Sequence, residues 1–453
     1  MEFETICERL NVLVSANRMG ELKGALTMLN IVDIAEYMNT LDNEKLLMVF
    51  RLLSKDISAD VFSYMDNDQQ HKIMDALEDT EAIHLLDDMF IDDAIDLLEE
   101  MPAGVVRRML AACDENKRAQ INQFLRYPEN SAGSIMTIEY VECHTGLTVG
   151  QAMANIRKTG VDKETIYTVY ILDERRVLLG TVPLRKMLLA PDDVLIESLM
   201  NPQFISVTTT DDQELVADTV RKYDLISIPV VDREKRMVGI ITVDDIVDVI
   251  EDENTEDFEK MAALLPSEDE YLKTPVVTLC KNRLPWLLIL MISATFTGMI
   301  ITHYENILST RGTIGVMLMA CIPMLMDTGG NCGAQASTLS IRGLALGEIE
   351  FRDLFKCLWK EFRVGLLLGV ILAAVNFARL VFLSKTGTSV ALIVSLAMFL
   401  TVILAKALGC TLPLLAKKMK LDPALMASPL ITTIVDACSL LILFTIATNI
   451  LKI

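Results

Sequence analysis

The sequence predicts a multidomain fold: an all-α superhelical N domain, an α/β pair of tandem repeats, a connecting helix and an α-helical membrane domain with five transmembrane helices. Three observations predict it: two internal repeats, five long apolar segments and an abrupt change of charge. The first 272 residues hold 25 Lys and Arg against 54 Asp and Glu, whereas the remaining 181 hold 16 against 8. A charged, acidic front is typical of soluble domains, and an apolar, slightly basic back is typical of a membrane domain.

The N domain, residues 1–130, repeats a helix-sized phrase. Tyr37-Met38, Tyr64-Met65 and Asp88-Met89 occupy equivalent places, 27 and then 24 residues apart. Leu, Met and Val recur at three- and four-residue steps between them, which predicts short helices that stack on a shared apolar face. Amphipathic helices of any helical domain also look alike, so the repeat alone leaves a non-repetitive helical domain open.

A second repeat covers residues 131–252, with copies at about 131–195 and 196–252. SIMTIEYVECHTGLTVGQAM matches ESLMNPQFISVTTTDDQELV, and Gly180 and Gly239 fall in the same place. Each copy predicts an extended segment, a helix, a strand, a turn at Asp173 or Asp232, a strand and a helix. The pair resembles tandem cystathionine-β-synthase-type (CBS) domains, which implies a ligand-responsive regulatory module and no reaction.

Residues 253–280 form the predicted connecting helix. The acidic stretch that follows the second copy has apolar residues at helical spacing, including Val249, Phe258 and Met261. This periodicity predicts a continuous helix that links a soluble sensor to the membrane domain. The alternative is a solvated acidic linker.

The membrane domain, residues 281–453, contains five segments long and apolar enough to cross about 30 Å of hydrocarbon. They are Leu284–Thr302, Thr313–Asp327 with a Gly-rich continuation, Val364–Leu383, Val390–Leu415 and Ala424–Leu451. Positive residues cluster after the second and fourth segments, at Arg342, Arg352, Lys356, Lys360, Arg363, Lys417, Lys418 and Lys420. The positive-inside rule therefore predicts a multi-pass protein of the cell inner membrane with its N-terminus in the cytoplasm and its C-terminus outside.

Asp436 lies near the middle of the last apolar segment. An ionisable side chain there costs about 3 kcal/mol, so it normally faces a water-filled path or a partner. Asp436 is therefore interpreted as a cation site in a pore. The alternative is a purely structural carboxylate that is hydrogen-bonded to a neighbouring helix. Gly329, Gly330 and Gly333, beside Asn331, predict a break in the second span whose freed carbonyls would line a cavity. Close packing of helices through small residues is the competing explanation.

Several classes of function are disfavoured by what the sequence lacks. The nine cysteines show no CxxC pair, and the four histidines have no ligand spacing, so neither a zinc site nor a nucleophile is predicted. No GxxxxGK[ST] loop occurs, which disfavours an ATP-driven pump. The acidic front does not favour nucleic acid. The protein is therefore predicted not to be an enzyme.

The order of domains, with the motifs GGNCGAQ at 329–335 and LDPALMASPLITTIVDA ending at Ala437, closely resembles the MgtE family of magnesium channels and transporters over nearly the whole length. Ala334 departs from the family, which commonly has Asn there, and this puts a contact at the pore mouth in doubt. The resemblance implies a homodimer in the lipid bilayer that conducts Mg²⁺ past one Asp436 from each subunit, with Gly330 and Asn331 nearby. It also implies regulatory Mg²⁺ held by cytosolic residues and closing the pore. These are Asp60, Asp92, Asp96, Gly133, Asp212, Glu214, Arg221, Asp224, Asp245, Asp248, Glu253, Glu256 and Asp257.

Two alternatives to a Mg²⁺-selective channel stay open at this point. Hard oxygen ligands discriminate cations by size and hydration, so a transporter of Co²⁺ or Mn²⁺ would use similar residues. A membrane-anchored CBS nucleotide sensor would need the spans only for dimerisation, and it would have no use for Asp436. The CBS resemblance also leaves room for an adenine nucleotide such as ATP as a modulator of a channel.

Overall fold

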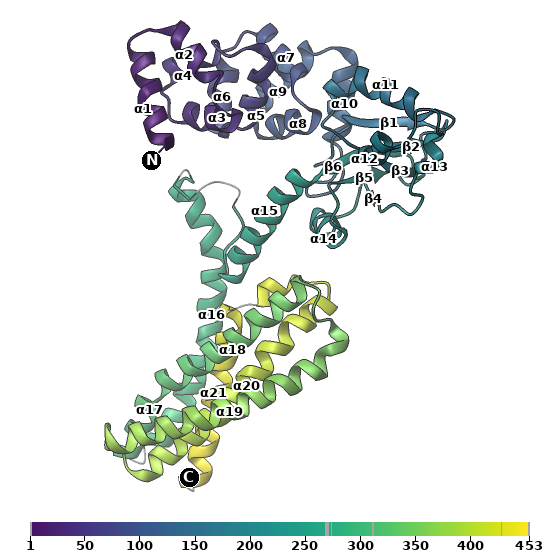
Figure 1. Cartoon of the computed structure of the whole chain (residues 1–453). Helices are drawn as coiled ribbons and strands as arrows, with labels where there is room; N and C mark the ends of the chain where they lie inside the picture. The colour runs from purple at the N-terminus through teal and green to yellow at the C-terminus, as the bar shows by residue number, and fades with distance from the viewer. Residues whose placement is uncertain (1, 268–270, 273, 310–311, 427, 452–453) are drawn as a thin grey trace. The chain divides into compact units, whose positions relative to one another are not determined.

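The computed structural model describes residues 2–267, 271–272, 274–309, 312–426 and 428–451. The chain forms two compact units, residues 1–251 and 252–453, shown together in Figure 1 and described separately below. The first contains the predicted N domain and the repeat pair. The second contains the end of the connecting helix and the membrane domain.

The N domain consists of short α-helices, as its repeats predict. Each of several helices packs on the helix two places further along the chain, as α3 does on α5, α5 on α7 and α7 on α9. Side chains such as Tyr37, Met38, Phe62 and Met74 are fully buried between them. The bounds are α1 Glu2–Ser15, α2 Met19–Leu26, α3 Ile31–Asn39, α4 Asn43–Phe50, α5 Lys55–Ser63, α6 Asn67–Ala76, α7 Asp79–Asp88, α8 Ile91–Glu100, α9 Ala103–Ala112 and α10 Glu115–Phe124.

Polar bonds join successive repeats at the predicted 27-residue spacing. The Asn39 amide donates to the Asp66 carboxylate at 2.9 Å, and the Asp66 backbone N–H donates back to the Asn39 side chain at 3.1 Å. Asp66 also precedes α6 as its N-cap residue. The reciprocal pair therefore fixes how one helix end meets the next repeat, which favours the stacked arrangement over a chance likeness.

The repeat pair forms two three-stranded sheets with the same topology. In each sheet the central strand pairs in parallel with the first strand and antiparallel with the third. This confirms the predicted order of elements in both copies. The first copy contains β1 Tyr140–His144, α11 Val149–Thr159, β2 Thr165–Leu172, β3 Leu178–Pro183 and α12 Leu184–Leu189; then follow α13 Ile196–Leu199, β4 Val207–Thr208, α14 Gln213–Tyr223, β5 Ser227–Val231 and β6 Met237–Thr242.

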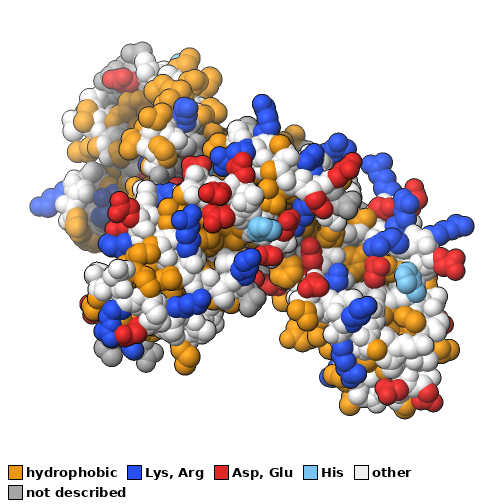
Figure 2. Space-filling view, turned by 90° about the horizontal axis from the view of Figure 1, so that it is seen from above, with side chains coloured by type: hydrophobic (Ala, Val, Ile, Leu, Met, Phe, Trp, Pro, Cys, Tyr) orange, Lys and Arg blue, Asp and Glu red, His pale blue; other side chains and the backbone are white. Residues whose placement is uncertain are grey.

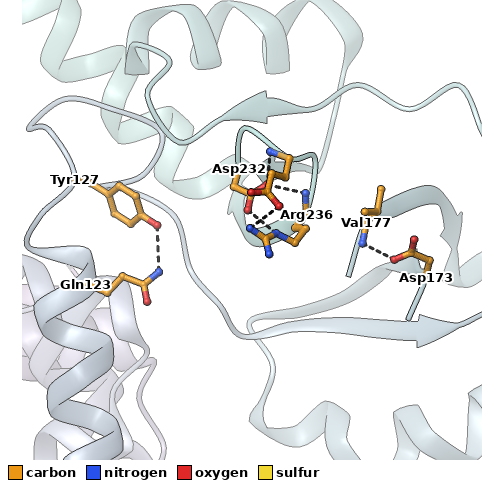
Figure 3. A network of polar contacts seen from close by, with 7 residues as sticks. Gln123, Tyr127, Asp173, Val177, Asp232 and Arg236 are labelled. Carbon is orange, nitrogen blue, oxygen red and sulfur yellow. Dashed lines mark hydrogen bonds and ion pairs between the residues drawn. The ribbon is translucent and has the colours of Figure 1, made fainter. Parts of the chain in front are cut away.

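The two hairpin turns are closed by equivalent aspartates, as Figure 3 shows. One Asp173 oxygen accepts from the backbone N–H of Val177 at 2.8 Å. One Asp232 oxygen accepts from the backbone N–H of Arg236 at 2.9 Å, and the other accepts from the Arg236 side chain. Aspartate favours such turns because its side chain can accept from backbone N–H groups a few residues ahead.

Gly180 and Gly239 are equivalent in space as well as in sequence. The leader segment of the second copy, which precedes β4, crosses β3, where a Cβ on Gly180 would overlap Met200 and Asn201. The leader segment of the first copy, which precedes β1, crosses β6, where a Cβ on Gly239 would lie 2.7 Å from the carbonyl oxygen of Thr137. Each copy is thus covered by the leader segment of the other, and only glycine leaves room for the close approach.

The connecting helix differs from the predicted one. Helix α15 runs from Val243 to Met261, so it begins directly after β6 and inside the range predicted for the second copy. A new helix, α16, begins at Val276. The predicted continuous helix over 253–280 is therefore wrong: Ala263 has a positive φ, and the chain turns back so that the Leu265 N–H donates to the Asn282 carbonyl at 3.0 Å.

Five helical segments are long and apolar enough to cross a membrane, which agrees with the prediction. Helix α20 packs on α18, α19 and α21 (Figure 1). Buried side chains such as Leu325, Val394 and Phe444 form the core among the membrane helices. Span two begins with α17 and continues as α18. The bounds are α16 Val276–Ser309, α17 Thr313–Ala320, α18 Ile322–Ala345, α19 Leu354–Phe382, α20 Thr388–Lys418, the 3₁₀ turn η3 Pro423–Met426 and α21 Ser428–Leu451.

Candidate functional site: a membrane acid and two groups of carboxylates

The Gly-rich stretch of span two does not break the helix, so the predicted cavity of freed carbonyls at Gly330 is wrong. Helix α18 is continuous through residues 329–335. The glycines lie where neighbouring helices touch: a Cβ on Gly329 would meet Thr401, one on Gly330 would meet Thr432, and one on Gly333 would meet Ile431. The competing explanation, close packing through small residues, is therefore the correct one.

The opposite face of α18 carries a polar stripe. Asp327, Asn331 and Gln335 follow one another at four-residue steps and are exposed within the chain. Exposed polar groups midway along a membrane helix require water or a protein partner. The predicted site residue Asn331 thus presents its side-chain amide, and not a backbone carbonyl of a loop. The four-residue spacing in the sequence could have identified Asp327 and Gln335 as members of the same helix face.

Asp436 lies on α21, which packs antiparallel to α18. Val435 contacts the Gly329 and Gly333 positions of α18, so the turn of α21 that carries Asp436 lies beside the turn that carries Asp327. The two carboxylates are close enough to repel each other, and the Asp436 side chain is partly exposed. Asp327 and Asp436 have no basic partner among the described residues, so this pair of acids favours the binding of a cation between the helices.

A lysine lies on the neighbouring helix. Lys406 of α20 is 4% exposed, and its ammonium donates to the Gln335 side chain at 3.3 Å. A buried intramembrane charge is costly and is functional by default. Lys406 therefore holds Gln335 at one end of the polar stripe on α18, and it was not among the predicted site residues.

In the first unit, the structure brings Asp60 and Asp92 of the N domain together with Asp245 at the start of α15. Burial and then repulsion by Asp93, Asp245 and Glu164 raise the pKa of Asp92 well above its usual value. Burial and repulsion by Asp245 and Asp60 raise the pKa of Asp93 to about 6. The cluster contains carboxylates from three separate parts of the sequence and lacks a neutralising base among these neighbours.

Two members of this cluster, Asp93 and Glu164, were not predicted. Burial and repulsion by Asp245, Asp244 and Asp93 raise the pKa of Glu164 to about 7. Asp245 is more strongly held, because Thr242 donates to its carboxylate through both its backbone N–H at 3.2 Å and its hydroxyl at 2.6 Å. Asp93 could have been found as the neighbour of Asp92, whereas Glu164 lies 71 residues further along and carries no local signal.

The neighbours that raise the pKa values of Asp92, Asp93 and Glu164 do not include the predicted residues of the second CBS copy. Asp212 is the N-cap of α14 and Asp224 its C-cap, so about 18 Å of helix separates them. Glu214 and Arg221 are exposed on α14, and the Arg221 guanidinium pairs with Asp218 at 2.6 Å. Gly133 donates its N–H to the Thr209 carbonyl at 3.0 Å. Asp96 and Asp248 are exposed.

In the second unit, the end of α15 forms an ion network with the turn before α21. Lys260 contacts Glu256 at 2.6 Å and Asp422 at 2.8 Å. Burial and repulsion by Asp422 raise the pKa of Asp257, while Lys260 and Arg342 act in the opposite direction. Two predicted regulatory residues, Glu256 and Asp257, thus lie beside a resident basic side chain, and Glu253 lies one turn before them.

No group of three or more His, Cys, Asp or Glu side chains is arranged as a metal-binding cage within the described residues. The donor chemistry of the cluster around Asp92, Asp93, Glu164 and Asp245 nevertheless fits a hard divalent cation, because all its groups are carboxylates whose charges repel one another. Over the face seen in Figure 2, acidic side chains lie among Lys and Arg rather than forming one continuous patch. The half-buried cluster is thus distinct from general surface acidity.

Comparison with known proteins identifies the family. The model of a divalent cation transporter family, MgtE, matches residues 322–446; that of the MgtE intracellular N domain matches 29–130, and that of the CBS domain matches 196–252. A magnesium transporter MgtE of Thermus thermophilus is 34% identical over 436 residues, which is 95% of each chain. The chain belongs to the MgtE family. A Bacillus subtilis magnesium transporter MgtE is 29% identical over 99% of this chain and 98% of its own.

Solved structures agree with this MgtE assignment for the soluble half. The soluble part of a magnesium transporter superposes with a TM-score of 0.53 at 32% identity, over 55% of this chain and 99% of its own. The cytosolic domain of the Mg²⁺ channel MgtE in complex with ATP superposes with a TM-score of 0.51 at 32% identity, over 54% and 99%. MgtE proteins are transporters and not enzymes, so the prediction that the chain has no catalytic function is confirmed.

Proposed function

We propose that the chain is a Mg²⁺-selective channel that mediates magnesium uptake and that closes when Mg²⁺ binds its cytosolic carboxylates. The observation that carries the proposal is the joint presence of two acid sites, one at mid-membrane and one in the soluble unit, in a chain similar over nearly its full length to magnesium transporters. The first site would pass the ion and the second would sense it.

The ion path would be lined by Asp436 and by the polar stripe of α18. Mg²⁺ gives up its hydration water reluctantly, so a carboxylate with amide neighbours suits a hydrated ion better than a tight cage. Because Asp327 and Asn331 are exposed on a membrane helix, a second copy of the chain would cover them. This supports a homodimer in the bilayer, with one Asp436 from each subunit facing a shared path.

The sensor would be the cluster of Asp60, Asp92, Asp93, Glu164 and Asp245. At low Mg²⁺ these carboxylates repel one another, and a bridging divalent cation would stabilise their close arrangement by mass action. Moving a gate from mostly open to mostly closed requires about 5.5 kcal/mol of differential binding. Additional weak sites at Asp96, Asp248, Glu253, Glu256, Asp257 and on α14 would supply the remainder.

Orientation and nucleotide binding complete the proposal. The N-terminus would be cytoplasmic and the C-terminus outside, because positive residues flank the second and fourth spans on the side of the soluble unit's connection. The inward electrochemical gradient would then drive Mg²⁺ entry, at about 2.3 kcal/mol per charge per 100 mV. ATP would act as a modulator at the CBS pair, as the solved ATP complex of a similar cytosolic domain suggests.

The test is Mg²⁺ flux into liposomes that contain only this protein, with the Mg²⁺ concentration on the soluble-unit side varied. Flux should be high at low Mg²⁺ and fall steeply as Mg²⁺ rises. Co²⁺ and Mn²⁺ offered in competition would show whether a different divalent ion is preferred. Absence of Mg²⁺ flux at every concentration contradicts the channel, and a flat response with high flux contradicts the sensor alone.

A further inference from the structure

Lys260, at the end of α15, pairs with carboxylates from two different parts of the second unit. Its ammonium group lies between two carboxylates, 2.6 Å from Glu256 on the same helix and 2.8 Å from Asp422 in the turn after α20. All three side chains are substantially shielded, with exposures of 22%, 36% and 29%. Shielding strengthens such contacts relative to ion pairs in open solvent.

Asp422 is itself held in place. Its first carboxylate oxygen accepts from the backbone N–H of Ala424 at 2.8 Å and so caps the 3₁₀ turn η3, which leaves the second oxygen for Lys260. The end of η3 is fixed in turn, because the Ser337 hydroxyl of α18 donates to the Met426 carbonyl at 3.0 Å. This turn leads into α21, the helix that carries Asp436.

We propose that Lys260 is a positioning residue: a built-in cation that ties the last turn of α15 to the turn preceding α21 without any bound metal. It deepens the proposed function, because it gives the sensor helix a direct connection to the helix with the pore acid. Adjacency alone does not establish coupling between sites, so the tie and its effect on flux require separate measurements.

Two other contacts near the end of α15 hold the chain that follows it, and neither involves Asp422. The Ser267 N–H donates to Glu259 at 2.9 Å, and the Leu265 N–H donates to the Asn282 carbonyl at 3.0 Å, so the chain beyond α15 is already folded back on α16. These bonds do not reach η3. Among the described interactions of α15, the Lys260 contact is the one that connects it to Asp422, and replacing the ammonium removes that connection together with the Lys260–Glu256 pair within the helix.

The first measurement is hydrogen exchange of the full-length protein in lipid nanodiscs with the metal chelated. In Lys260→Met, amides of residues 253–261 should exchange on the order of five-fold faster than in the wild type, the change expected when an ion network at the upper end of the range of ion pairs is lost. Asp422→Asn should have the same effect, because it removes the charge that pairs with Lys260. The amide oxygen of the new side chain can still accept from Ala424 and cap η3. Lys260→Arg should retain slow exchange.

The control is Lys356→Met. Lys356 also pairs with an acid, Asp353, at 2.8 Å, but its side chain is 83% exposed and it lies on α19. This variant should leave exchange at 253–261 unchanged. The double variant Lys260→Met with Asp422→Asn should be no faster than either single variant, because both remove one shared contact. Unchanged exchange in Lys260→Met, or additive effects of the two changes, would overturn the tie.

The second measurement is the Mg²⁺ dependence of liposome flux. Lys260→Met should need several-fold more Mg²⁺ for half-maximal closure, because the helix end is no longer held near η3 in advance. If the proposed channel function fails, wild type and variant will both lack Mg²⁺ flux while the contrast in hydrogen exchange persists. If exchange differs but closure does not shift, the tie is structural and its proposed role in gating is wrong.

Discussion

Gly409 of α20 and Gly333 of α18 lie back to back where the two membrane helices touch: a Cβ on Gly409 would overlap the Gly333 carbonyl oxygen. Both positions are helical, so glycine is used here for space rather than for an unusual backbone angle. The contact lies on the face of α18 that carries Gly333, whereas Asp327 and Asn331 lie on its exposed face. It also makes the membrane domain sensitive to a single added methyl group.

Gly409→Ala should therefore destabilise the membrane domain by about 1–3 kcal/mol, the usual cost of overpacking a tight contact. Gly298→Ala is the matched control, since Gly298 also lies within a membrane helix but has open space around its Cβ position. Thermal unfolding in detergent followed by size-exclusion chromatography measures the difference. Equal midpoints for the two variants would contradict the packing role.

Asp436→Ala should reduce Mg²⁺ flux at least ten-fold while the protein remains folded. Removing the acid lowers the cost of placing α21 in the membrane by about 3 kcal/mol, so loss of flux would not reflect failed insertion. Asp436→Glu, which keeps the charge, should retain part of the flux. Liposome flux measures both variants, and wild-type flux in Asp436→Ala would exclude the residue from the ion path.

Asp93→Asn should stabilise the first unit when Mg²⁺ is chelated. Burial and repulsion raise the pKa of Asp93 to about 6, so its charged form opposes folding at neutral pH. At 1.4 kcal/mol per pKa unit, the gain should be about 1–3 kcal/mol. Asp75→Asn, an exposed change on α6, should have little effect. Hydrogen exchange of α8 measures both, and the gain in Asp93→Asn should shrink when Mg²⁺ is present.

Acid pH should replace Mg²⁺ in holding the acidic cluster together. The pKa of Asp93 is raised to about 6 and that of Glu164 to about 7. Protonation of the two groups therefore stabilises the folded unit, and this contribution is fully present when the pH is below the pKa values of the groups in the unfolded chain. That contribution is lost as the pH rises through 6 and 7. Mg²⁺ should therefore protect the unit from protease strongly at pH 7.5 and weakly at pH 5.5. Equal protection at both pH values would show that Mg²⁺ acts elsewhere.

If the proposed gating holds, amide replacement of Asp245 and Asp248 should leave Mg²⁺ conduction at Mg²⁺ concentrations that close the wild type. These two changes keep side-chain size and leave the Lys260 network intact, unlike replacement of Glu256. Pore selectivity should not change, because Asp436 is untouched. Single-channel recording across a Mg²⁺ titration measures the response, and an unshifted inhibition curve would mean that the start of α15 is only a solvated surface.

The domain order, the repeats and the five spans could be predicted because each leaves a periodic or compositional signal. Gly180 and Gly239 were matched by sequence for that reason. The Gly-rich stretch of span two could not be resolved: glycine suits both a broken helix and a close helix contact, and only Thr401, Thr432 and Ile431 on other helices decide between them. Glu164 and Lys260 were missed because Asp93, beside Glu164, and Asp422, beside Lys260, lie far along the chain from them.

The exchange of leader segments between the two CBS copies has a consequence for how this module folds. Asn201 pairs with Thr181 at the edge of β3, and Thr137 pairs with Ile240 at the edge of β6, so neither copy can complete its own sheet environment alone. The two copies should melt in a single cooperative transition, and a fragment cut between them should expose two sheet edges and aggregate. During synthesis the β3 edge of the first copy can therefore be covered only after Asn201 has been made, and the leader segment around Thr137 can pair only after β6 has been made.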